Sequence, residues 1–164
     1  YFVEYGVWSV RQREQFVKDV YNAVKQNSLD LVVKIHPVLE YREDYEKIAI
    51  KYPFKIYKDE SLRDLILNCD IAITIMSSAG LEVMVANKPL IIYNPYGEPT
   101  VFKEGVLSAN IQSELLLAIK YAKSGLSSKL INEAKIFVDK QTYIQDGKSA
   151  ERIANLIMEM GDKS

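Results

Sequence analysis

The chain has 164 residues, of which 48% are hydrophobic and 26% charged, a composition typical of one globular domain and unlike a disordered or collagen-like chain. Its 21 basic and 22 acidic residues nearly cancel, so no overall field favours nucleic acid or an anionic membrane, and any bound anion must be held locally. The one cysteine, Cys69, excludes an internal disulfide and favours a cytoplasmic location, while Glu82 and Lys88 interrupt the most apolar region, so no membrane span is expected.

Strand-like and helix-like patterns alternate along the chain. In chain order the first half predicts a strand over 1–5, a helix over 13–24, a strand over 29–35, a helix over 41–51 and a strand over 54–57. A short helix from 61, a strand over 71–75, a helix ending at 86 and strands over 90–93 and 105–107 follow. The chain ends in three amphipathic helices with apolar stripes over 111–122, 130–138 and 153–160. We expect one domain over 1–164, and the start at Tyr1 without an initiator Met suggests a piece of a longer polypeptide.

The strand over 71–75 is almost entirely apolar, which is typical of a strand buried on both faces of a parallel sheet. Repeated strand–helix units with right-handed crossovers predict an α/β fold: a doubly wound, mainly parallel, Rossmann-like sheet with helices on both faces. If the strands follow the order 3-2-1-4-5-6, a ligand would bind where the first and fourth strands end, at residues 6–13 and 76–82.

The first candidate site is the turn Ser77-Ser78-Ala79-Gly80, which joins the apolar strand to a helix. The first N–H groups of a helix lack intrahelical acceptors and attract phosphate, hydroxyls can donate to its oxygens, and Gly80 would let a ligand approach the backbone. Glu82, one turn into the helix, could accept a hydrogen bond from a ribose hydroxyl. In the alternative interpretation one serine only caps the helix and Glu82 is solvated.

The second candidate is His36, the only histidine, which ends the strand over 29–35 and is followed by Pro37. An imidazole there could donate to a diphosphate or to a departing phosphate, although a lone histidine can equally be structural. Arg11 and Arg13 could reach the same phosphates from the start of the first helix, or could be solvated first-turn charges.

Several chemistries lack their signatures. The sequence contains neither a P-loop motif nor Gly-x-Gly-x-x-Gly, and no Gly-x-Ser-x-Gly elbow. One histidine and one cysteine are too few soft ligands for a zinc site, so we expect no metal and no cofactor.

The ordered segments Lys34-Ile35-His36-Pro37, 65–74, 77–84 and 87–93 together resemble the carboxyl-terminal, donor-binding half of GT-B glycosyltransferases. The resemblance is to the capsule-polysaccharide, sialyltransferase and CDP-glycerol glycerophosphotransferase groups, and to relatives of UDP-N-acetylglucosamine 2-epimerase. It implies a domain that binds a UDP-, CDP- or CMP-linked nucleotide sugar for surface polysaccharide synthesis, located in the cytoplasm or held at the membrane surface through the rest of the chain.

The same resemblance implies roles for individual residues. His36 would assist departure of the donor's phosphate, Ser77 and Ser78 would hold the phosphates, and Glu82 would bind the ribose. The position eight residues after Glu82 is Leu90, so retaining families with the Glu-x7-Glu pattern are disfavoured. The acceptor site and the catalytic base would lie in an amino-terminal domain, so this chain alone would be inactive. An epimerase-like isomerase and a non-catalytic nucleotide-binding or interaction module remain the alternatives.

Overall fold

The structure is a computed structural model that describes residues 8–142, 144 and 146–161. Its elements, in chain order, are α1 (Val10–Gln26), β1 (Val32–Lys34), α2 (Arg42–Lys51), β2 (Lys55–Tyr57), α3 (Leu62–Asn68), β3 (Ala72–Thr74), α4 (Ala79–Val85), β4 (Leu90–Tyr93), β5 (Leu107–Ala109), α5 (Gln112–Ser124), α6 (Ser128–Gln141) and α7 (Ser149–Gly161). The strand expected over 1–5 lies outside the described residues.

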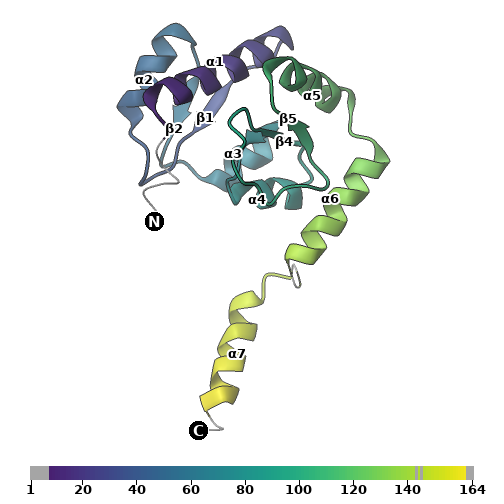
Figure 1. Cartoon of the computed structure of the whole chain (residues 1–164). Helices are drawn as coiled ribbons and strands as arrows, with labels where there is room; N and C mark the ends of the chain where they lie inside the picture. Colours follow the sequence, from purple (N-terminus) through teal and green to yellow (C-terminus); the bar gives the residue numbers. More distant parts are fainter. Residues whose placement is uncertain (1–7, 143, 145, 162–164) are drawn as a thin grey trace.

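The described strands form two parallel sheets (Figure 1). β1 pairs with β2 in the register Val33↔Ile56, while β3, β4 and β5 form a three-stranded sheet in that order. These three pairs are all neighbours in the order 3-2-1-4-5-6, and the remaining two pairs of that order involve the strand over 1–5. The α/β class with parallel strands is therefore confirmed, and one continuous doubly wound sheet stays a prediction.

β4 is the centre of the larger sheet and is buried along its whole length. Ile91 and Tyr93 join one apolar cluster with residues of α1 and α5, and Leu90 and Ile92 join another with residues of α3, α4 and α6. Because successive side chains of a strand point to opposite faces, helices cover both faces of this sheet. The apolar run over 90–93 is buried in this way, whereas the strand over 71–75, expected to be buried on both faces, is only partly buried along β3.

α1 begins at Val10, three residues earlier than the sequence pattern suggested. The Ser9 hydroxyl accepts from the Gln12 N–H, and the Gln12 side chain accepts from the Ser9 N–H, which makes a capping box. β5 also differs from the expected strand over 105–107. Gly105 has φ +68° and packs against the backbone of Ala134 in α6, so the extended backbone starts only at Leu107.

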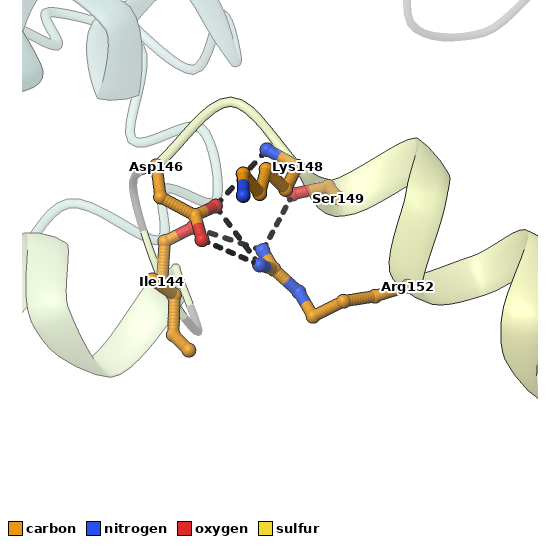
Figure 2. A network of polar contacts seen from close by, with 5 residues as sticks. All are labelled: Ile144, Asp146, Lys148, Ser149 and Arg152. Atoms are coloured by element: carbon orange, nitrogen blue, oxygen red, sulfur yellow. Dashed lines mark hydrogen bonds and ion pairs between the residues drawn. The ribbon is translucent and has the colours of Figure 1, made fainter.

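α7 departs from the expected arrangement of helices on both faces of the sheet. None of its residues is buried, and Ile157, in the apolar stripe over 153–160, is 63% exposed. Figure 1 shows α7 standing away from the sheets beyond α6. A polar network holds its start (Figure 2): Arg152 donates to both Asp146 oxygens at 2.9 Å and to the Ile144 carbonyl and the Ser149 hydroxyl at 3.2 Å.

Candidate functional site

The His36 side chain folds back onto its own turn just beyond the carboxyl end of β1. Its Nδ1 accepts hydrogen bonds from the Val38 N–H at 3.1 Å and from the Leu39 N–H at 3.0 Å. An Nδ1 that accepts two hydrogen bonds cannot carry the proton of a neutral imidazole, so the proton lies on Nε2. Since His36 is exposed, Nε2–H is a hydrogen-bond donor available to a ligand.

Glu40 closes this turn from the other side. One carboxylate oxygen accepts from the His36 backbone N–H at 2.6 Å, and the other accepts from the Tyr45 hydroxyl. Tyr45 is 7% exposed on α2, and its burial, followed by the charge of Glu40, raises the pKa of its hydroxyl well above the usual range. The hydroxyl therefore stays protonated at ordinary pH and remains a donor to Glu40.

Arg13 extends this network to α1. Its guanidinium forms an ion pair with Asp44 at 3.0 Å and lies over the Tyr45 ring at 5.4 Å from the centroid. The Arg13 side chain is only 11% exposed, and its positive charge is already balanced by the Asp44 carboxylate. Arg11, by contrast, is exposed in the first turn of the same helix.

The turn that follows β3 is built mainly on Ser77. The Ser77 hydroxyl accepts from the Ala79 N–H at 3.3 Å, and its carbonyl accepts from the Gly80 N–H at 2.9 Å. Ser78 makes no side-chain cap bond and is exposed, as is Glu82 one turn further on. Ser77 thus behaves as a capping residue, and all three of Ser77, Ser78 and Glu82 are exposed.

Gly80 has a packing role that the sequence did not reveal. It is buried, and an added Cβ would lie 2.7 Å from Cζ of Phe102 and 3.1 Å from Cδ2 of Leu90. The absence of a side chain is therefore explained by the aromatic ring that covers this residue. Whether a ligand also approaches the Gly80 backbone remains a prediction.

The structure joins some predicted site residues and not others. Hydrogen bonds connect His36 to Glu40 and Tyr45, and Arg13, paired with Asp44, joins this group by lying over the Tyr45 ring. Among the described residues, no hydrogen bond links this network to Ser77 or its neighbours. The two groups share only their topological place, because each follows the carboxyl end of a parallel strand.

Sequence reasoning missed Glu40, Tyr45 and the role of Lys34. The Lys34 ammonium donates to the carbonyls of Lys58 at 2.5 Å and of Ile35 at 3.2 Å, so it joins the carboxyl ends of β1 and β2. Glu40 lies four residues after His36, a spacing at which a carboxylate can close a turn onto a backbone N–H, but no motif marks it. Tyr45 belongs to the buried face of α2, which the periodicity of that helix could have indicated.

Other features of the described residues lie apart from this site. A hollow of about 520 Å³ between α2 and β2 is lined by Arg42, Glu46, Ile50, Phe54 and neighbouring residues, and none of the predicted site residues lines it. The described residues contain no group of three or more histidine, cysteine or acidic side chains placed to hold a metal ion. No helix in the described part of the chain combines the length and apolar character that a bilayer span requires.

Comparison with known proteins gives two matches. Residues 8–159 match the family model described as CDP-Glycerol:Poly(glycerophosphate) glycerophosphotransferase. The chain is also 30% identical, over 135 residues, to the teichoic acid glycerol-phosphate primase of Bacillus subtilis (strain 168); the match covers 77% of this chain and 34% of the relative. The chain thus spans about a third of the length of that relative. No solved structure matches the chain significantly.

Proposed function

Because the chain belongs to the CDP-glycerol:poly(glycerophosphate) glycerophosphotransferase family, we propose that it binds the nucleotide of a CDP-glycerol donor for a transferase that builds a cell-surface polymer. The observation that carries this proposal is the family match over 8–159, which includes both His36 and the turn at Ser77. The relative named as a teichoic acid glycerol-phosphate primase supports the same kind of product.

A CDP-glycerol donor implies one specific reaction, the transfer of glycerol phosphate. In a glycerophosphotransferase reaction an acceptor hydroxyl oxygen forms a bond to the phosphorus that carries the glycerol. The bond from that phosphorus to the oxygen bridging the two phosphates breaks, and CMP departs with the bridging oxygen and its electron pair. The transferred group is glycerol phosphate rather than a sugar, and negative charge develops on the CMP phosphate as it leaves.

We assign the stabilisation of this charge to His36. Its Nδ1 is occupied by the N–H groups of Val38 and Leu39, so Nε2–H is the atom directed to the ligand. A hydrogen bond from Nε2–H to the departing phosphate strengthens as negative charge grows on that phosphate, which lowers the barrier to transfer. Ser78 is proposed to bind a phosphate oxygen, Glu82 the ribose, and Arg11 to add positive charge.

Arg13 has a different proposed role from the one expected. Since its guanidinium is paired with Asp44 and stacked on Tyr45, it supports the site rather than contacting phosphate directly. Ser77 is proposed to shape the turn through its bonds to the N–H groups of Ala79 and Gly80, and its hydroxyl hydrogen is left to donate to a phosphate oxygen. The acceptor site, and the base that takes the proton of the acceptor hydroxyl, are proposed to belong to the rest of a longer polypeptide.

Calorimetric titration of the chain with CDP-glycerol, CDP, CMP, UDP and GDP tests the proposal. We expect the cytidine nucleotides to bind, with modest affinity because the acceptor side is absent, and UDP and GDP to bind more weakly. Binding of none of them at millimolar concentration would contradict the proposal and favour a non-catalytic module. Release of CMP from CDP-glycerol and a glycerol phosphate acceptor by the chain alone would contradict the assignment of the base to another domain.

A further inference from the structure

The turn that carries His36 is held by a relay of side chains from two helices. Glu40 is bonded to the His36 backbone N–H and to the Tyr45 hydroxyl. Tyr45 is in turn covered by the Arg13 guanidinium, which Asp44 fixes from the side. The relay therefore runs from α1, through α2, to the backbone of the histidine itself.

We propose that Glu40 is a positioning residue for His36, and that Tyr45 and Arg13 fix the Glu40 carboxylate so that the imidazole presents Nε2–H to the donor phosphate. This inference rests on the proposed function, because it specifies how the phosphate-binding atom of that site is oriented. Glu40 does not touch the nucleotide, and it acts only through the turn it closes.

The geometry shows why a carboxylate is needed at this position. Both Glu40 oxygens accept a hydrogen bond, one from a backbone N–H and one from a hydroxyl. A glutamine has one acceptor oxygen, and its NH2 group would face the second donor. Glu40→Gln should therefore keep one of the two bonds, whereas Glu40→Ala loses both.

The relay also explains why the imidazole cannot simply rotate. When Glu40 holds the His36 N–H, residues 36–40 form a closed turn, and the N–H groups of Val38 and Leu39 converge on Nδ1. If the turn opens, these two donors separate from the ring, and either Nδ1 or Nε2 can then carry the proton. The orientation and the tautomer of the His36 imidazole thus both depend on the Glu40 carboxylate.

The variants Glu40→Ala, Glu40→Gln and Tyr45→Phe test the proposal, with Glu43→Ala as the control. Glu43 is an exposed acidic residue in the first turn of α2, so its removal changes the net charge equally without opening the turn. The probes are CDP-glycerol affinity, the ring nitrogen shifts of the single histidine, and amide exchange at Val38 and Leu39.

We expect Glu40→Ala to weaken CDP-glycerol binding by about three- to tenfold, the value of one ordinary hydrogen bond. Glu40→Gln and Tyr45→Phe should lose less. In Glu40→Ala the two ring nitrogen shifts should move toward each other and the Val38 and Leu39 amides should exchange faster, while Glu43→Ala matches the parent. In a His36→Ala background, Glu40→Ala should cause no additional loss of affinity.

Two failures can be told apart. If His36→Ala binds CDP-glycerol as tightly as the parent, the proposed function of His36 is wrong, whatever Glu40 does to the imidazole. If His36→Ala weakens binding but Glu40→Ala leaves the ring nitrogen shifts and affinity unchanged, the positioning role is overturned. An equal loss from Glu40→Ala with and without His36 would also overturn it, because Glu40 would then act independently of the histidine.

Discussion

The substitution Gly80→Ala tests the close packing of Phe102 against the turn after β3. The added Cβ would lie 2.7 and 2.9 Å from two ring carbons of Phe102. Carbon atoms pack best at about 3.5–4.0 Å, so the ring would have to retreat by roughly 0.8 Å. Phe102 is 3% exposed and packs against Phe137 with ring centroids 5.9 Å apart, which limits that movement. Overpacking of this kind costs about 1–3 kcal/mol.

The assay is the free energy of unfolding from urea titration, with the melting temperature as a second measure. At this chain length the cost corresponds to a fall of about 2–12 °C. Gly161→Ala is the matched control, because nothing lies within 4 Å of a Cβ there. In a Phe102→Leu background Gly80→Ala should cost less, since the clashing ring atoms are gone. Unchanged stability of Gly80→Ala, or an equal cost in both backgrounds, would refute the packing argument.

Three further predictions concern stability. Ile91 is fully buried in β4, so Ile91→Asp should unfold the domain by burying an unpaired charge, and a thermal melt like that of the parent would mean that the sheet is misplaced. Asp19 is buried in α1 and accepts hydrogen bonds from the Tyr93 hydroxyl at 2.9 Å and from the Gln15 side chain at 2.8 Å. In Asp19→Asn the new NH2 group would face one of these donors, so the free energy of unfolding in urea should fall by about 1–3 kcal/mol, and by less when Tyr93 is already phenylalanine. Burial raises the pKa of Tyr45 and of Tyr93, so above pH about 10 these tyrosines ionise first in the unfolded chain, and the free energy of unfolding should fall by up to about 1.4 kcal/mol per pH unit for each. In Tyr93→Phe the fall of unfolding free energy with pH should be shallower, and an identical alkaline slope would count against the burial of this hydroxyl.

The sequence predicted the layered part of the fold well, because the signals there are local. The apolar run over 90–93 has no polar face, and β4 is covered by helices on both sides, while β3 within the run over 71–75 is only partly buried. The start of α1 was missed although Ser9 and Gln12 form a recognisable capping-box pattern. The exposure of α7 could not be predicted, since periodicity shows which face of a helix is apolar and not whether another element covers it.

The candidate site was predictable only in part, for a related reason. His36 and Ser77 follow strand ends, and a strand end can be located from the residues around it. The contacts that decide the roles of Arg13 and Gly80 are distant in sequence: Arg13 pairs with Asp44 across 31 residues, and Gly80 packs against Phe102. Such contacts depend on how helices are placed on the sheet, which the local pattern does not encode.

The main role proposed for His36 is to donate Nε2–H to the phosphate of a CDP-glycerol donor. Its most direct test is the CDP-glycerol affinity of His36→Ala, measured by calorimetry beside the melting temperature. Loss of one charge-assisted hydrogen bond, about 1.5–3 kcal/mol, predicts ten- to hundredfold weaker binding, with a nearly unchanged melting temperature because His36 is exposed. Binding as tight as that of the parent, or a lower melting temperature with unchanged affinity, would contradict the claim.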